Sequence, residues 1–278
     1  MGEPQMTLAG RRLRNASLAA ALFGAAAFAV HLHDLALRDA SFLSGWLLAG
    51  AFVLLALYNA RKKIPVLPLG TSAGWMQLHV YFGLIAGGLF VLHAGAGLPN
   101  GVLESLLWAC TVALVATGIA GLAVTRLAPR AITEHGERLI FERIPRLRRE
   151  LAEAVRAEVE ASVAEGHATA LADYYRDRLH AYFSRPRHLV QHLLGSRAPV
   201  QRLCREVRSL ERYLAGQDVQ RLAEIEERIV AKDNLDYQTA WQGLLKGWLF
   251  VHVPLTYVTA IFAAIHVAVV YAFASAQP

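Results

Sequence analysis

Residues 248–273 read WLFVHVPLTYVTAIFAAIHVAVVYAF, an apolar run long enough to cross a lipid bilayer as a helix. The run carries two histidines, His252 and His266, which are 14 positions apart. A helix turns by about 100° and rises about 1.5 Å per residue, so both imidazoles project from one face, roughly 21 Å apart along the axis. Because ionisable side chains inside a bilayer are costly, they generally mark a functional site.

The same spacing occurs in a second membrane-length run. Residues 74–95 read GWMQLHVYFGLIAGGLFVLHAG and contain His79 and His93, which are again 14 positions apart. Two such helices side by side would offer two pairs of histidines at two depths. A haem iron held from both sides by neutral imidazoles needs that arrangement, since imidazole is a suitable ligand for iron. We therefore expect all four histidines to be metal ligands.

The two histidine-bearing runs resemble the haem-binding helices of the dihaem cytochrome b superfamily. This superfamily includes the cytochrome b subunit of respiratory quinol:cytochrome c oxidoreductases and other bacterial dihaem membrane cytochromes. The resemblance implies two b-type haems, one held by His79 with His252 and the other by His93 with His266. It also implies quinone or quinol as a mobile partner. The likeness is confined to these helices and the small residues around them, because the chain has fewer apparent spans than the respiratory subunit and no PEW-type quinol motif.

Hydrophobic residues make up 55% of the 278 positions and fall in long blocks, a pattern typical of an integral membrane protein in contact with lipid. The expected fold is an all-α bundle of five transmembrane helices with a helical cytoplasmic insertion before the fifth. The expected spans are Ala16–His33, Ser41–Ala60, Gly74–Gly95, Leu103–Val124 and Trp248–Phe273.

Charged residues are segregated along the chain. Between Arg126 and Lys246 lie 21 of the 28 lysines and arginines and 18 of the 22 acidic residues. The expected organisation is therefore a membrane part at 1–125, a charged insertion at 126–246 and a last span at 247–278. The basic excess belongs to loops and flanks, which favours an anionic lipid surface over nucleic acid.

Basic residues in short loops predict the orientation. They gather before the first span, in the second connection and at the start of the insertion, whereas the third connection has no Lys or Arg. The N-terminus and residues 126–246 are therefore expected on the cytoplasmic side of a bacterial cytoplasmic (inner) membrane. The third and fifth spans then run in the same direction, which puts His79 level with His252 and His93 level with His266.

Several residues near the histidines have two interpretations. Gly83 and Gly87 suit close approach of a flat macrocycle, or ordinary packing between helices. Arg61 is a candidate partner for a haem propionate, or a determinant of topology. Pro254 kinks the last span and aims His252, or it occupies the first turn of a helix that begins near His252.

The charged insertion is predicted to be helical, with breaks at Gly166 and Pro186 and a further helical run at about 200–231. It is either a solvated helical hairpin or a docking platform for a peripheral redox subunit. The two cysteines, Cys110 and Cys204, are too few for an iron–sulfur cluster, and no CxxCH motif occurs. Any further redox centre is therefore expected on a partner carrying an iron–sulfur cluster, flavin or cytochrome c.

The preferred interpretation is an electron-transfer subunit of a membrane oxidoreductase, a dihaem cytochrome b that conducts electrons across the bilayer between a quinone pool and a peripheral partner. The alternative is a structural anchor or assembly subunit without a redox role of its own. A transporter with a histidine proton relay is a third interpretation, but it gives no reason for the matched spacing.

Overall fold

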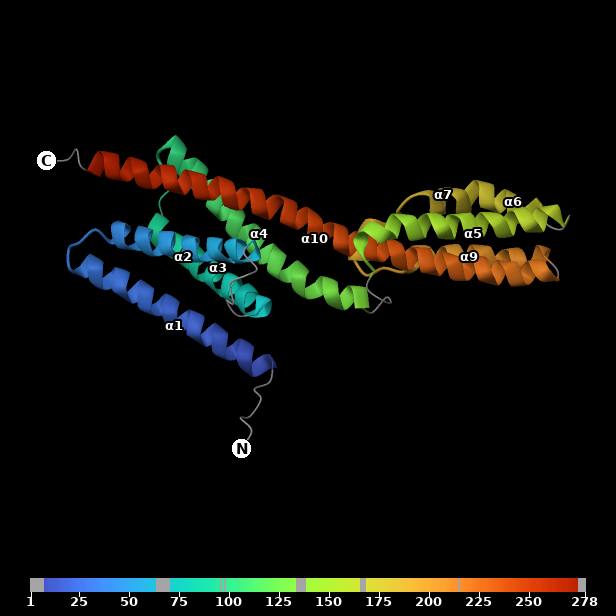
Figure 1. Cartoon of the computed structure of the whole chain (residues 1–278), viewed down its shortest axis with the longest axis horizontal. Helices are drawn as coiled ribbons and strands as arrows, with labels where there is room; N and C mark the ends of the chain where they lie inside the picture. Colours follow the sequence, from blue (N-terminus) through green and yellow to red (C-terminus); the bar gives the residue numbers. More distant parts are fainter. Residues whose placement is uncertain are drawn as a thin grey trace, which may run out of the picture. The chain divides into compact units, whose positions relative to one another are not determined.

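The computed structural model describes residues 8–63, 71–95, 97, 99–133, 139–165, 169–214 and 216–274. All regular secondary structure within these residues is helical (Figure 1). Among the described residues, five helices are long and apolar enough to cross a membrane, which agrees with the predicted all-α class and the predicted number of membrane-length helices. They are α1 (Leu8–Leu35), α2 (Ala40–Lys63), α3 (Ser72–Ala94), α4 (Val102–Thr133) and α10 (Gln217–Ala274).

The chain divides into two compact units. We call residues 1–122 and 249–278 the membrane unit and residues 123–248 the charged unit. Helices α4 and α10 each contribute to both units, because their bounds pass from one range into the other.

The membrane unit is built on close packing of its first three helices. Leu48 of α2 and Ile85 and Leu89 of α3 are buried together, with Phe23 of α1 packed against them. Gly88 makes this approach possible, because a Cβ there would lie 2.5 Å from the Phe23 ring. Within a membrane this packing is stabilised by van der Waals contact between the helices, because lipid tails are as apolar as these side chains.

The histidine-bearing helices run in the same direction. Figure 1 shows α3 and the C-terminal part of α10 pointing one way, and α2 and α4 pointing the other. Helix α3 begins after Thr71, whose hydroxyl accepts a hydrogen bond from the Gly74 amide at 3.2 Å. It ends at Gly95, whose φ of 64° is readily adopted by glycine.

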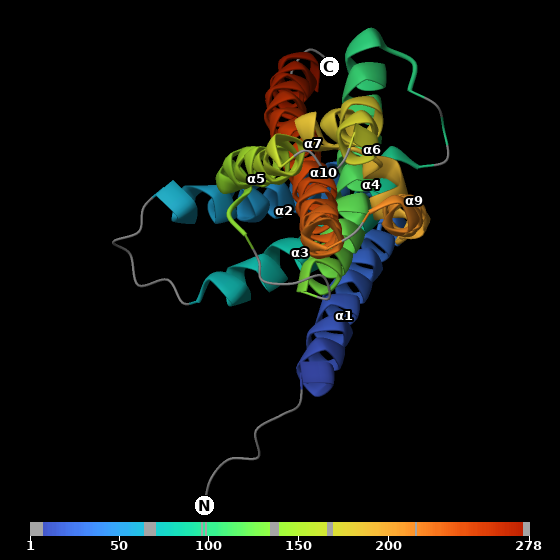
Figure 2. The same ribbon diagram turned by 90° about the vertical axis from the view of Figure 1, so that its right-hand side faces the viewer.

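The charged unit is a separate helical body. Its helices α5, α9 and the first part of α10 lie side by side (Figure 2), and their inner faces share a core that includes Val155, Val207 and Ile225. Its remaining elements are η1 (Phe141–Arg143), α5 (Ile144–Ala164), α6 (Thr169–Tyr174), η2 (Tyr175–Leu179), α7 (His180–Ser184), α8 (Leu189–Leu193), α9 (Ala198–Arg208) and η3 (Ser209–Tyr213).

The last span differs from its sequence-based prediction in where its helix begins. The apolar run from Trp248 is the C-terminal part of α10, which starts at Gln217 and continues without a break. Pro254 therefore lies deep inside a helix, so the interpretation of a first-turn proline was wrong. A proline inside a membrane helix is tolerated because neighbouring groups satisfy the carbonyl that it leaves free.

Candidate functional site

The four histidines all lie in the membrane unit, and all four side chains are partly buried. The structure brings His93 of α3 and His266 of α10 together, with ring centroids 6.3 Å apart and ring planes at 83°. Two imidazoles bound to one metal through nitrogen bonds of about 2.0 Å would have centroids roughly 6 Å apart. The spacing of this pair therefore fits a shared metal ion.

The His93 ring is oriented by the first turn of α2. Its Nδ1 lies 3.1 Å from the Ser41 carbonyl oxygen and 3.1 Å from Ser44 Oγ, while Ser44 Oγ itself lies 3.1 Å from the Ser41 carbonyl oxygen. A carbonyl oxygen only accepts, so we assign the proton to Nδ1 as the donor to Ser41. The lone pair of the neutral ring is then on Nε2, which leaves that nitrogen available to bind a metal.

The His93 ring packs against α2 at Gly45. A Cβ at this position would lie 3.0 Å from His93 Cε1, closer than an ordinary van der Waals contact. A side chain at residue 45 would therefore push the ring aside by a few tenths of an ångström from where Ser41 and Ser44 hold it.

We expect Gly45→Ala to move the His93 ring by a few tenths of an ångström and so disturb the ligand field of any metal it binds. If His93 and His266 hold a haem, electron paramagnetic resonance of the oxidised protein should show a shift in the g-values of that haem's low-spin signal. Gly50→Ala is the matched control, since a Cβ at Gly50 of the same helix would meet no atom within 4 Å. Identical spectra for the two variants would show that contact with Gly45 does not govern the ring position.

His252 is oriented in a similar way from α4. Its Nδ1 lies 2.9 Å from Thr117 Oγ1, which also lies 3.0 Å from the Leu114 carbonyl oxygen. A hydroxyl has one proton, and we assign it to the Leu114 carbonyl, which only accepts. Thr117 then accepts from His252 Nδ1–H, and His252 has the same tautomer as His93. Gly118 lies beside this ring, because a Cβ there would be 3.7 Å from His252 Cε1.

The remaining predicted site residues have varied surroundings. The His79 ring packs against Tyr58 of α2 with centroids 5.0 Å apart. A Cβ added at Gly87 would lie 3.4 Å from Val115 Cγ1 of α4, which is an ordinary contact distance. A Cβ at Gly83 would meet no atom within 4 Å. Arg61 belongs to α2, but its side chain lies outside the described residues.

An aromatic triad joins α2 to α10 within the membrane unit. Phe42 and Trp46 of α2 and Tyr271 of α10 pack edge to face with centroids 6.2 to 6.5 Å apart, and Trp46 Nε1 donates to Tyr271 Oη at 3.2 Å. All three rings are about half exposed. Sequence reasoning missed the triad because its members come from helices at opposite ends of the chain.

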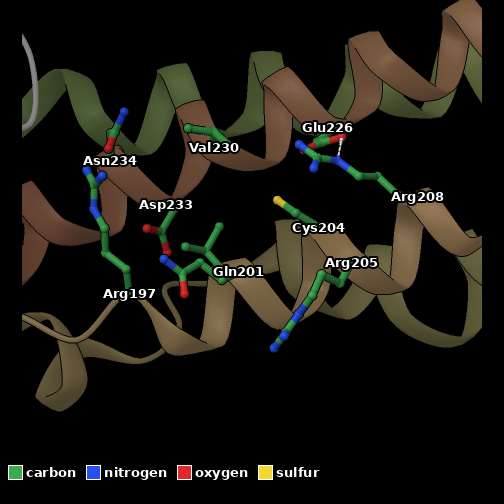
Figure 3. Close-up of a pocket in the computed structure, with 10 residues that line it drawn as sticks. Arg197, Gln201, Cys204, Arg205, Arg208, Glu226, Val230, Asp233 and Asn234 are labelled. Atoms are coloured by element: carbon green, nitrogen blue, oxygen red, sulfur yellow. Dashed lines mark hydrogen bonds and ion pairs between the residues drawn. The ribbon is translucent and has the colours of Figure 1, made fainter.

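The charged unit holds a shallow groove of about 400 Å³ between α9 and α10 (Figure 3). Arg208 crosses it to form a two-pronged ion pair with Glu226, with nitrogen–oxygen distances of 2.5 and 2.7 Å. Cys204 lines the groove, and burial raises the pKa of its thiol, so it stays protonated and poorly nucleophilic at neutral pH. The groove lining mixes both signs of charge and shows no nucleophile paired with a base.

A buried charge cluster was also missed by sequence reasoning. Lys232 and Asp236 of α10 are almost fully buried and hydrogen-bonded to each other, and the ammonium also donates to the Arg185 carbonyl at 3.1 Å. The Asp236 carboxylate accepts from the Arg187 amide at 2.9 Å. The sequence signal for this ion pair was the spacing of Lys232 and Asp236, which are four residues apart on one helix. The cluster fastens the connection between α7 and α8 to α10, which is a structural role.

Searches of protein-family models, curated proteins and solved structures found no match to this chain. The function therefore has to be inferred from the chemistry of the paired histidines.

Proposed function

We propose that the chain is a membrane-bound dihaem cytochrome b that conducts electrons across the bilayer as one subunit of an oxidoreductase. The observation that carries the proposal is the pairing of His93 with His266 at a ring separation of 6.3 Å. The proposed ligand sets are His93 with His266 and His79 with His252. A bound haem would supply reversible one-electron chemistry at each of the two levels.

The hydrogen bonds of two of these histidines agree with a role in metal binding. Both histidines with described Nδ1 contacts point that nitrogen at an oxygen acceptor, from Ser41 and Ser44 in one case and Thr117 in the other. An imidazole that serves as a ligand usually donates its second nitrogen to such a partner, which fixes the tautomer and the ring plane. A buried histidine of any role needs an acceptor for its N–H, so these contacts agree with a ligand role, and the spacing of His93 and His266 carries the proposal.

The directions of the two histidine-bearing helices bear on which histidines are proposed to lie at the same depth in the membrane. Helix α3 and the last part of α10 run the same way (Figure 1), and the histidines are 14 residues apart on each. The proposal therefore puts His79 level with His252 and His93 level with His266. In the proposed orientation the N-terminus and the charged unit are cytoplasmic, so the His93 pair is nearer the opposite face. Quinone or quinol is proposed as the mobile partner, and a peripheral subunit on the charged unit as the other redox partner.

The purified full chain should contain two non-covalent b-type haems. We expect a reduced-minus-oxidised difference spectrum with a b-type α-band, and a pyridine haemochrome assay that gives two haems per chain. Acidic acetone should extract both haems, because the sequence has no CxxCH motif for covalent attachment. A preparation that is folded but lacks an α-band would contradict the proposal and support the anchor alternative.

A further inference from the structure

Thr117 of α4 contacts one of the candidate metal ligands. Its Oγ1 is within hydrogen-bond distance of both the Leu114 carbonyl oxygen and His252 Nδ1, which lies 135 positions further along the chain. Thr111 is on the same helix and is buried, but its hydroxyl donates to the Leu107 carbonyl at 2.7 Å. Back-bonding to a preceding carbonyl is common for threonine in membrane helices. The contact with a candidate metal ligand is what distinguishes Thr117.

We propose that Thr117 is a positioning residue that sets the tautomer of His252 and lowers the reduction potential of the haem that His252 binds. This inference rests on the proposed dihaem function. The Thr117 hydroxyl gives its own proton to Leu114 and accepts the proton of His252 Nδ1. The imidazole nitrogen left for the iron is thereby more electron-rich, and an electron-rich ligand stabilises ferric over ferrous iron.

The two histidine sites differ in how they accept the Nδ1 proton. His93 donates to a backbone carbonyl together with the Ser44 hydroxyl, so loss of a side chain would leave the Ser41 carbonyl in place. For His252 the described acceptor is the side-chain hydroxyl of Thr117, which Thr117→Val removes. Thr117 is therefore the point at which the potential of one haem can be changed without replacing a ligand.

The test is a redox titration of the purified full chain carrying Thr117→Val. Valine has nearly the same shape as threonine but lacks the hydroxyl that accepts the hydrogen bond. We expect both haems to be retained and one of the two midpoint potentials to rise, with a change in the g-values of one low-spin signal. Thr117→Ser keeps the hydroxyl and should restore the wild-type potential. Thr111→Val is the matched control and should leave both potentials unchanged.

The outcomes separate this inference from the proposed function. A wild-type chain without haem would contradict the dihaem function itself. If the wild-type chain holds two haems and Thr117→Val leaves both potentials and both signals unchanged, the positioning role of Thr117 is wrong while the dihaem function stands. Loss of one haem in Thr117→Val but not in Thr117→Ser or Thr111→Val would also support the role, since the ligand then depends on the hydroxyl.

Discussion

If the chain binds two haems as proposed, replacing His93 with alanine should remove one of them from the purified protein and leave the other in place. A haem held by His93 and His266 would keep only one protein ligand in this variant, and the truncated side chain also opens space where the imidazole packed against Gly45. The measurement is the haem content per chain by pyridine haemochrome, with the spectrum of the haem that remains. His31→Ala, an exposed histidine at the end of α1, is the control and should keep both haems.

The pairing can be tested by comparing the four single variants. His93→Ala and His266→Ala should leave the same residual haem, with the same α-band and the same midpoint potential. His79→Ala and His252→Ala should leave the other one. Added imidazole should restore the lost haem in His93→Ala, because a free ring can occupy the space of the removed one. Different residual spectra for His93→Ala and His266→Ala would overturn the pairing, whatever the total haem content.

The features that sequence could predict are those set by local patterns. Apolar length gave the five membrane helices, and the 14-residue interval placed each pair of histidines on one helix face, since both depend only on the geometry of a single helix. The close approach of His93 and His266 could be expected because the spacing is equal in two spans that run the same way. The start of α10 at Gln217 was missed because the change from charged to apolar residues near Trp248 marks the start of the apolar run and not the start of a helix. The helix continues through Gly243 and Gly247 without a break.

The groups that orient the histidines could not be found in the sequence. Ser41 lies 52 positions from His93, and Thr117 lies 135 positions from His252. Serine and threonine are common in membrane helices, so their residue type carries little information until the packing of α2, α3, α4 and α10 is known. Gly87 illustrates the same limit, because a glycine beside a histidine suits a macrocycle as well as the Val115 side chain that it faces here.

The largest expected effect on folding is at the buried charge cluster. Lys232→Met should lower the free energy of unfolding of the charged unit by about 3 kcal/mol, because it leaves the Asp236 carboxylate buried without its closest positive partner. Methionine can also fill the space over the Tyr182 ring, where the ammonium lies 3.9 Å from the centroid. The destabilisation should therefore come mainly from the unpaired charge and not from a cavity.

Hydrogen–deuterium exchange of the full chain in detergent measures this effect within the charged unit. Amides of α5 and of the first part of α10 should exchange roughly a hundredfold faster in Lys232→Met, as expected for opening that is easier by about 3 kcal/mol. The exposed ion pair Arg146–Glu150 provides the control. Arg146→Met should change the free energy of opening, as measured by exchange, by less than about 0.5 kcal/mol.

A double variant distinguishes the unpaired charge from any other cause of the instability. Lys232→Met combined with Asp236→Leu removes both charges, so it should be more stable than Lys232→Met alone. Recovery should be partial, because the Arg187 amide loses its carboxylate acceptor and Arg148, whose Nε is 3.6 Å from Asp236 Oδ1, loses its ion pair. If the double variant is less stable than Lys232→Met, the carboxylate contributes more through Arg148 and Arg187 than it costs as an unpaired charge. The assignment of Lys232 as its essential partner would then be wrong.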